Sequence, residues 1–504
     1  MPCFSCRYTV LLFVLMVARC AHADVRVAGI FNDHMVLQRK QPVQVWGWAD
    51  QDAVVQVTFA DHIVETVAVE GAWSVTLPAM EAMSTGNDLL VSSQGQTITI
   101  RDVAVGEVWL ASGQSNMAMT VGAMQNELPL VADDIAAADL PSLRFCRISD
   151  GESLQPLDDL RQRATWVTCS PTTASNFSGV AFYFALRLHR DLNVPIGIID
   201  SSRGGTPIEP FIPRPAFASH PTLQKELELG DREDLEGIWK LPGGVRARDT
   251  NWLPGRLFHS RLAPIARFAV RGAIWYQGES NCGVGEDPRD YEHKQRALIE
   301  GWRQAWGAPD RPVYVVQLPG SGAGANWPYL REQQRLASNH PHSGMVVTID
   351  IPGAGIHPPN KIDVGDRLAR WALANDYQQK IPFSGPLFDR QVIEEDRIVI
   401  HFQHAEHGLM KATKAGLLPP QETPEAELAE FELLDERGNW HSATAKIAGQ
   451  TVVVSCPDVS APVAARYAYS VTPQHPNLYN REGLPAAPFC SRPELLTCEP
   501  GIPQ

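Results

Sequence analysis

Four polar segments of this sequence could together carry out nucleophilic catalysis, because each follows an apolar run that is typical of a buried strand. They offer a hydroxyl, an imidazole, a carboxylate and amide or main-chain N–H donors, which are the groups that acyl transfer uses. The segments are Gly113-Gln114-Ser115-Asn116, Arg203-Gly204-Gly205, Gln277-Gly278-Glu279 and Gly355-Ile356-His357.

Ser115 and His357 are the candidate nucleophile and general base. Ser115 follows an apolar strand at the predicted start of a helix, where the helix N-terminus would favour a nearby oxyanion. Taken alone, Ser115 is better explained as a helix N-cap. His357 lies in a proline-rich loop that leads into the last predicted helix, a position suited to a base. A Gly-x-Ser-x-Gly elbow is absent from the sequence, which disfavours an α/β-hydrolase fold.

A parallel sheet would bring the four segments together, because ligands bind beyond the carboxyl ends of its strands. Strand-like runs alternate with helical patterns, which indicates a parallel sheet covered on both faces. We therefore predict an α/β domain over residues 102–383. Its expected strands are Val105–Ala111, Ile196–Asp200, Ala269–Tyr276, Val313–Leu318 and Met345–Asp350, and its expected helices are Val180–Leu192, Tyr291–Trp306 and Val364–Ala374.

Strand patterns without helices flank this domain. Period-2 alternation over residues 24–101 predicts an N-terminal β-sandwich, and strands return in a C-terminal β region over residues 384–504. A charged stretch around Lys225–Glu236 is expected to be an exposed helix inserted in the α/β domain.

Residues 1–23 have the pattern of a secretory signal peptide. Arg7 precedes the apolar run Tyr8–Val17, and Ala21-His22-Ala23 is a small-residue cleavage signal. We expect a secreted or periplasmic protein; lipidation at Cys20 is the weaker alternative. No later run reaches the ~18 apolar residues that a membrane-spanning helix needs.

The charge balance bears on partners, because 43 Lys and Arg oppose 57 Asp and Glu, a net charge of −14. Such a surface argues against nucleic acid as the main partner. Six of the nine cysteines lie beyond residue 23, so one or two disulfides are plausible in an oxidising compartment. Cys490 with Cys498, and Cys146 with Cys169, are the nearest pairs, but the connectivity stays open.

His401, His404 and His407 recur every three residues, a spacing that could hold a metal ion on a helix. His401 ends a strand-like run and Gly408 follows, so we expect a turn there instead.

The sequence resembles the sialate O-acetylesterase family, a branch of the SGNH (GDSL-like) carbohydrate acetylesterases. The resemblance covers nearly all of the chain beyond residue 23 and is carried by several segments. They include Gly-Gln-Ser115-Asn, Trp-Tyr-Gln277-Gly-Glu279-Ser-Asn, Val45-Trp46-Gly47-Trp48, Gly204-Gly205-Thr206-Pro207-Ile208-Glu209, Ile356-His357-Pro358 with Asn360-Lys361, and Asn477-Leu478-Tyr479-Asn480. The resemblance implies a flavodoxin-like SGNH hydrolase domain with accessory β-domains, acting on O-acetylated sugars without metal or cofactor.

Carried over by this resemblance, Ser115 is the nucleophile and His357 the general base. The N–H of Ser115, the N–H of Gly205 (or Gly204) and the side chain of Gln277 would form the oxyanion hole. Each such donor contributes about 3 kcal/mol to transition-state stability.

The sequence departs from the family pattern at two places. The family usually has an Asp two or three residues before the His, where this chain has Gly355 and Ala354. We predict Glu279 as the orienting acid; Asp350, or a Ser–His dyad with a backbone carbonyl, are the alternatives. Arg203 replaces a commonly aromatic residue, and either contacts a substrate carboxylate or pairs with a local acid.

These observations predict a secreted serine esterase that removes O-acetyl groups from carbohydrates through an acetyl-serine intermediate. Sialic acid and acetylated plant polysaccharides, such as xylan or xyloglucan, are both open as substrates. A non-catalytic carbohydrate-binding homologue is the rival from another class. A glycosidase would need two facing carboxylates, and the sequence singles out only Glu279. The sequence does not indicate the oligomeric state.

Overall fold

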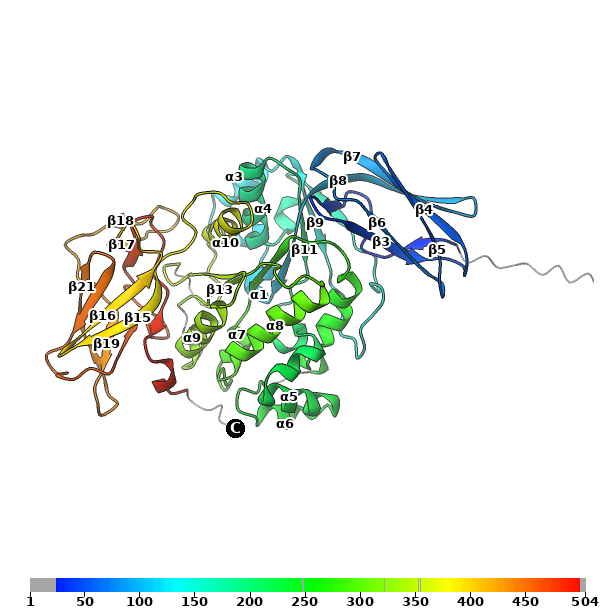
Figure 1. Ribbon diagram of the computed structural model, residues 1–504. Helices are drawn as coiled ribbons and strands as arrows, with labels where there is room; N and C mark the ends of the chain where they lie inside the picture. The colour runs from blue at the N-terminus through cyan, green and yellow to red at the C-terminus, as the bar shows by residue number, and fades with distance from the viewer. Residues whose placement is uncertain (1–23, 247–248, 321, 352, 354, 499–504) are drawn as a thin grey trace, which may run out of the picture.

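The computed structural model describes residues 24–246, 249–320, 322–351, 353 and 355–498. Figure 1 shows a central α/β part with β sheets on either side, one group near the N-terminus and one near the C-terminus. This arrangement confirms the predicted mixed α/β class with additional β regions. The predicted signal peptide lies outside the described residues. Within the described ranges, every helix is too short or too polar to cross a bilayer.

The central sheet is organised around strand β8, Gln96–Gly113. β8 pairs in parallel with β11 on one side and with β12 on the other. The path β10-β9-β11-β8-β12-β13-β14 is parallel throughout except for β10. Besides β8, its strands are β9 Leu140–Arg147, β10 Trp166–Cys169, β11 Ile196–Asp200, β12 Gly272–Tyr276, β13 Val313–Val316 and β14 Ser343–Val346.

The carboxyl end of β8 lies where the order of the strands reverses. The chain passes from β8 to β9 and β11 on one side, and only later to β12, β13 and β14 on the other. The loops after β8, β11 and β12 therefore lie at the switch point of the sheet, which is where open α/β sheets bind ligands.

β8 also joins the N-terminal region to the central sheet. Its first part pairs antiparallel with β7 and its middle pairs with β2, while the part from Glu107 on pairs with β11. The predicted boundary between residues 101 and 102 thus falls inside one continuous strand. Residues 103–113 are all buried, because both faces of the sheet are covered there.

The N-terminal region consists of two sheets. One has the order β1-β3-β6, and the other joins β4, β5 and β7 to the first part of β8. Its strands are β1 Arg26–Val27, β2 Val36–Gln38, β3 Val43–Trp48, β4 Val54–Phe59, β5 His62–Val67, β6 Ala72–Leu77 and β7 Met83–Ser93.

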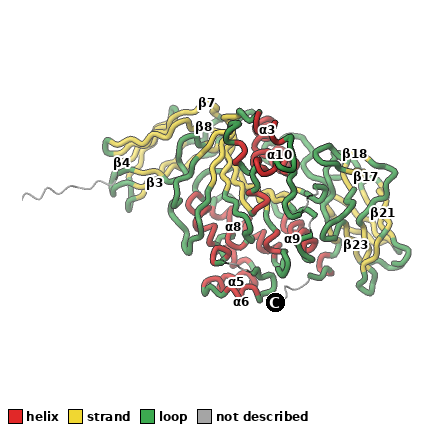
Figure 2. Tube along the Cα trace, turned by 180° about the vertical axis from the view of Figure 1, so that it is seen from behind, coloured by secondary structure: helices red, strands yellow, loops and turns green. Residues whose placement is uncertain are grey.

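Helices cover both faces of the central sheet. α4 packs against α10 on one face, and α8 packs against α9 on the other (Figures 1 and 2). All three predicted helices are confirmed as α4, α8 and α10, with ends shifted by a few residues. The longer helices are α4 Gly179–Leu192, α5 Pro221–Asp231, α8 Tyr291–Ala305, α9 Trp327–Ser338 and α10 Lys361–Asn375; the shorter are α1 Ser115–Ala118, α2 Val121–Met124, α3 Val131–Ala136, α6 Leu235–Trp239 and α7 Glu279–Cys282.

The inserted charged segment forms α5 and α6 rather than one exposed helix. Most of its charges are exposed, but Glu226 is buried and lies 3.0 Å from the Nζ of Lys294 on α8. Lys294 also binds the buried carboxylate of Glu209. This ion cluster anchors the insertion to the central part.

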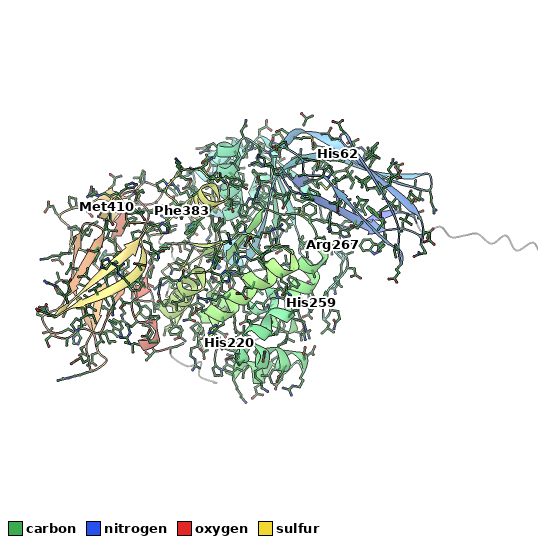
Figure 3. All side chains as sticks on the ribbon, viewed as in Figure 1. His62, His220, His259, Arg267, Phe383 and Met410 are labelled. Atoms are coloured by element: carbon green, nitrogen blue, oxygen red, sulfur yellow. The ribbon has the colours of Figure 1, made fainter. Side chains whose placement is uncertain are left out.

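Within the described residues, the C-terminal region contains three small sheets, one of which packs against α9. Phe383 joins the two parts (Figure 3), because its ring lies 4.8 Å from that of Trp371 on α10 and 5.0 Å from that of His404. His404 lies in a turn after β16, as predicted. The strands are β15 Leu387–Glu394, β16 Arg397–Gln403, β17 Leu409–Thr413, β18 Gln421–Glu422, β19 Phe431–Leu434, β20 Trp440–Ser442, β21 Thr444–Ala448, β22 Thr451–Ser455, β23 Ala464–Tyr467, β24 Leu478–Asn480 and β25 Phe489–Cys490.

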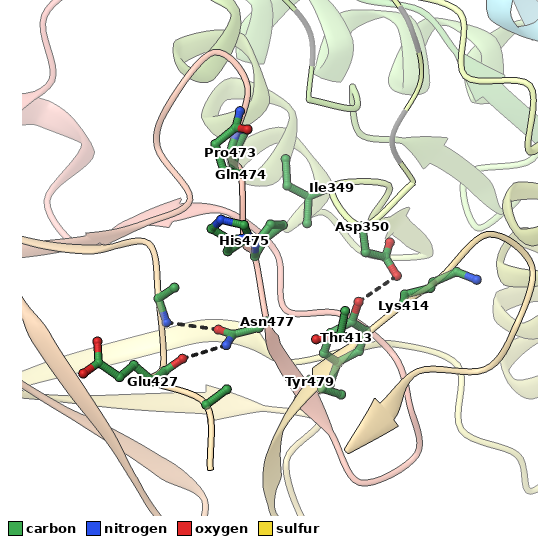
Figure 4. Close-up of a pocket in the computed structure, with 14 residues that line it drawn as sticks. Ile349, Asp350, Thr413, Lys414, Glu427, Pro473, Gln474, His475, Asn477 and Tyr479 are labelled. Atoms are coloured by element: carbon green, nitrogen blue, oxygen red, sulfur yellow. Dashed lines mark hydrogen bonds between the residues drawn. The ribbon is translucent and has the colours of Figure 1, made fainter. Parts of the chain in front are cut away.

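A cavity of about 380 Å³ lies between this region and the end of the central sheet (Figure 4). The Tyr479 hydroxyl donates to Asp350 across one wall at 3.2 Å. The guanidinium of Arg367 on α10 holds the same carboxylate with two bonds of 2.7 Å.

The suggested disulfides are not formed. Cys146, Cys169, Cys282, Cys456 and Cys490 are buried free thiols, so neither nearest pair is bridged. Burial raises the pKa of the Cys169 thiol to about 12, which keeps it protonated and unreactive.

Candidate active site

Ser115 and His357 meet at the carboxyl end of β8. The Oγ of Ser115 lies 2.7 Å from the Nε2 of His357. Ser115 is the first residue of α1, and His357 is a half-buried residue of the loop before α10. The two residues are 242 positions apart in the chain, so the fold alone brings them together. A hydroxyl and an imidazole in this arrangement can act as nucleophile and general base.

Gly113 makes this approach possible. Its φ of +135° is unfavourable for any residue with a side chain, and a Cβ there would lie 2.1 Å from the carbonyl oxygen of Tyr276. The chain can therefore turn from β8 into α1 while staying against β12.

The Gly204–Gly205 loop lies beside Ser115. The main-chain N–H of Arg203 donates to the carbonyl of Gly113 at 2.9 Å and ties this loop to the nucleophile loop. A Cβ added to Gly204 would be 3.7 Å from the Cβ of Ser115, and Gly205 has a φ of +67°. Both glycines are exposed. Their main-chain N–H groups are thus placed where a substrate oxyanion could bind.

Gln277 does not fit the predicted role of oxyanion donor. Its side chain is fully buried, and its Nε2 donates to Asn281 at 2.7 Å and to Gln114 at 3.0 Å. Its Oε1 accepts from the Tyr291 hydroxyl at 2.7 Å. Both amide hydrogens are used inside the protein, so Gln277 braces the loops below the site instead of reaching the substrate.

The buried ion cluster of Lys294 and Glu209 also holds Asn281, the residue that accepts a hydrogen bond from Gln277. The Nδ2 of Asn281 donates to Glu209 at 2.8 Å, and Glu209 in turn binds Lys294. The Gln277 amide is therefore held by groups that are themselves fixed, which makes its orientation rigid.

Glu279, the predicted orienting acid, does not bond to His357 in the structure. Its carboxylate instead accepts from the Nδ2 of Asn116. The Oδ1 of Asn116 accepts from the Nζ of Lys361, so the Asn116 amide lies between Glu279 and Lys361. Burial raises the pKa of Glu279 to about 7, although its hydrogen bond from Asn116 and the charge of Lys361 oppose this.

Asp350, the alternative acid, is also engaged elsewhere, by Arg367 and Tyr479. Among the residues that the structure describes, none places a carboxylate or a carbonyl within hydrogen-bond distance of the Nδ1 of His357. Among the described residues, none therefore takes the place of the acid that bonds to the histidine in a catalytic triad.

The electrostatic surroundings of His357 favour its neutral form. Burial lowers the pKa of His357, and the nearby positive charge of Lys361 lowers it further. Burial likewise lowers the pKa of Lys361 to about 7, against the attraction of Glu279. A neutral imidazole whose Nε2 faces the Ser115 hydroxyl is ready to accept its proton.

Arg203 stands at the rim of the site. Its guanidinium donates to the Oδ1 of Asn251 at 3.0 Å and is half-buried. In the described ranges, no carboxylate lies within ion-pair distance of it, so the predicted pairing with a local acid is not observed. The buried Arg261 nearby adds to the positive potential.

Sequence reasoning missed the roles of Asn116, Lys361, Asn281 and Glu209. All four stand in segments quoted for the family resemblance, yet none of them was assigned a role there. Asn116 directly follows the nucleophile and Lys361 is four residues past the base, which are signals that could have pointed to them.

Across the described residues, no group of three or more His, Cys, Asp or Glu side chains is arranged to hold a metal ion.

Comparisons with known proteins relate the chain to carbohydrate esterases. The family profile described as "Carbohydrate esterase, sialic acid-specific acetylesterase" matches residues 243–374, which include Gln277, Glu279 and His357. Mouse sialate O-acetylesterase is 30% identical over 436 residues, covering 75% of this chain and 78% of the mouse protein. The human enzyme is 29% identical over 532 residues and 95% of both chains. The crystal structure of a carbohydrate acetylesterase from Xanthomonas citri superposes with a TM-score of 0.80 at 32% identity, over 93% of this chain and 99% of that one.

The charge of Lys361 generates a prediction about pH. In Lys361→Met the imidazolium of His357 loses a repulsive neighbour, so the His357 pKa rises. The acidic limb of kcat/KM, which reports the essential base of the free enzyme, should therefore move to higher pH. Rates of 4-nitrophenyl acetate hydrolysis across pH measure this shift.

Lys411→Met is the matched control, because Lys411 donates to the carbonyl of Ala426 in the C-terminal region at 2.6 Å. Its pH profile should equal that of the wild type. An acidic limb that stays in place, or moves to lower pH, in Lys361→Met would contradict the electrostatic role.

Proposed function

Because this chain belongs to the sialate O-acetylesterase family of carbohydrate esterases, and is thus a carboxylic ester hydrolase, we propose that it deacetylates carbohydrates through an acetyl-serine intermediate. The observation that carries the proposal is the 2.7 Å contact between Ser115 Oγ and His357 Nε2 at the carboxyl end of β8. The exposed glycine loop beside Ser115 supports it further.

The proposed reaction begins when the Oγ of Ser115 attacks the acetyl carbonyl while the Nε2 of His357 takes the hydroxyl proton. The main-chain N–H groups of Ser115 and Gly205 (or Gly204) stabilise the oxyanion. His357 then passes the proton to the departing sugar oxygen, leaving the acetyl group on Ser115. Water, deprotonated by the same imidazole, attacks this ester, and Ser115 leaves with a proton as acetate is released.

We also propose the finer architecture that goes with this chemistry. Residues 102–383 would form a flavodoxin-like SGNH hydrolase domain that shares strand β8 with a β-sandwich-like domain at residues 24–101. Residues 384–504 would form a second β-sandwich-like domain. Support comes from the strand order around β8 and from the site at its carboxyl end. Residues 1–23 would direct the protein to the periplasm or the exterior, as their charged start and apolar run indicate.

Ser115→Ala tests whether Ser115 accepts the acetyl group. Acetate release from 4-nitrophenyl acetate should fall by at least about 1,000-fold, because only the oxyanion donors and binding remain. The melting temperature should stay at the wild-type value, since the side chain that is removed is small. An inactive wild type, on this ester and on a panel of acetylated glycans, would favour the non-catalytic carbohydrate-binding alternative.

The natural substrate would carry a carboxylate. Arg203 lies beside the glycine loop, and its guanidinium is bonded to a neutral amide rather than to an acid. Arg pairs strongly with carboxylates, which sialic and uronic acids have and which neutral xylan or xyloglucan chains lack. Arg203 therefore favours an acidic sugar over a neutral plant polysaccharide.

Arg203→Leu separates these substrates. The KM for O-acetylated sialic acid should rise about tenfold or more, since a charged hydrogen bond contributes roughly 1.5–3 kcal/mol. The rate on 4-nitrophenyl acetate should change little. Arg397→Leu, which removes an exposed arginine from β16, serves as control. Equal losses on both esters, or none on either, would rule out carboxylate recognition by Arg203.

A further inference from the structure

His357 must be oriented by something other than a side-chain acid. The Nε2 of the imidazole faces Ser115, and no acceptor for Nδ1 is found in the described part of the chain. A free imidazole ring on a loop would sample several orientations, and misplacement by 1 Å can cost about 100-fold in rate. The cause of its orientation therefore lies in the loop that carries it.

Asn116 holds that loop. Its Nδ2 donates to the main-chain carbonyl of Ile356 at 2.7 Å, directly before His357 in the chain. Pro358 and Pro359 follow His357 and restrict the backbone on its other side. Asn116 itself directly follows Ser115, so one side chain links the backbones next to the nucleophile and the base.

Two ionisable groups determine which way the Asn116 amide points. The carboxylate of Glu279 can only accept, so it must face Nδ2; the ammonium of Lys361 can only donate, so it must face Oδ1. Asn116 and Lys361 are completely buried, and Glu279 is 5% exposed. Water therefore cannot substitute for either partner. The titratable groups that face Lys361 are Glu279 at the start of α7, His357 on the loop before α10 and Tyr276, whose ring centroid is 5.1 Å from Nζ.

We infer that Asn116, with its amide oriented by Glu279 and Lys361, is a positioning residue that holds His357 against Ser115 through the carbonyl of Ile356. It does by a main-chain clamp what the acid does in a Ser-His-Asp triad. This inference rests on the proposed function, and it gives Glu279 an indirect role in place of the predicted contact with His357.

A double-mutant cycle tests the inference. The cycle compares wild type, Asn116→Ala, His357→Ala and the double variant for kcat and KM on 4-nitrophenyl acetate. Asn116→Ala should lower kcat by about 10- to 100-fold with little change in KM, because only the base is misplaced. In the His357→Ala background the same substitution should have no further effect, since it acts only through the imidazole.

Asn480→Ala is the matched structural control. Asn480 is a buried asparagine remote from the site, and its Nδ2 likewise donates to main-chain carbonyls, those of Ser384 at 2.9 Å and His404 at 3.1 Å. It should lower the melting temperature as Asn116→Ala does, yet leave kcat within about twofold of wild type, because its bonds hold Ser384 and His404 rather than the nucleophile or the base. Glu279→Gln, close to isosteric, is a second variant. The new amide at position 279 can donate as well as accept, which lets the Asn116 amide flip. Introducing Glu279→Gln into the wild-type enzyme should therefore lower kcat, whereas introducing it into His357→Ala should not.

The outcomes separate this inference from the proposed function. With wild-type activity well above that of Ser115→Ala, an Asn116→Ala variant that keeps wild-type kcat would overturn the inference alone. So would losses from Asn116→Ala and His357→Ala that multiply in the double variant. Wild-type activity no greater than that of Ser115→Ala would refute the proposed function, and the inference with it.

Discussion

The parallel pairing of β8 with β11 on one side and β12 on the other is the constraint on which the rest of the site depends. It places three loops at one edge of the sheet, and those loops carry Ser115, the Gly204–Gly205 pair and Gln277. The paired part of β8, residues 103–113, is buried on both faces, so this pairing lies in the interior of the protein. Gly113 lets the strand end against Tyr276 and turn at once into α1.

Charged and amide side chains are buried next to these loops. Lys294 is paired with Glu209 and Glu226, and Lys361 and Glu279 are separated by Asn116. Buried ions are costly unless they are paired and hydrogen-bonded. Here they orient the amides of Asn281 and Asn116, which in turn fix Gln277 and the loop of His357. The rigid support allows donors and base to be in place before the substrate arrives.

Many of these elements could be predicted from the sequence, for physical reasons that differ between them. α4, α8 and α10 were predictable because each presents a regular apolar stripe. α9 was not, because Arg331 and Gln334 are polar yet buried; the Arg331 guanidinium donates to the carbonyl of Ser470, and Gln334 accepts from the N–H of Leu318. β9 was missed as well, since Pro141 interrupts its apolar run.

At the site itself, the strand ends located Ser115 and His357, and the resemblance supplied the roles of Gln277 and Glu279. Neither of those two roles fits the structure, because whether a buried polar group faces the substrate or the protein depends on partners that no local pattern reveals. The nearest acid in the sequence, Asp350, is likewise taken by Arg367 on α10.

The proposed mechanism depends on Ser115 accepting the acetyl group with His357 as its base. Rapid-quench mass spectrometry after mixing with 4-nitrophenyl acetate is the experiment that would detect this intermediate. We expect one acetyl group on the peptide that contains Ser115, formed in a burst before steady turnover, and absent in Ser115→Ala. Turnover without any acetylated Ser115 peptide, or an acetyl group on a different residue, would refute the mechanism.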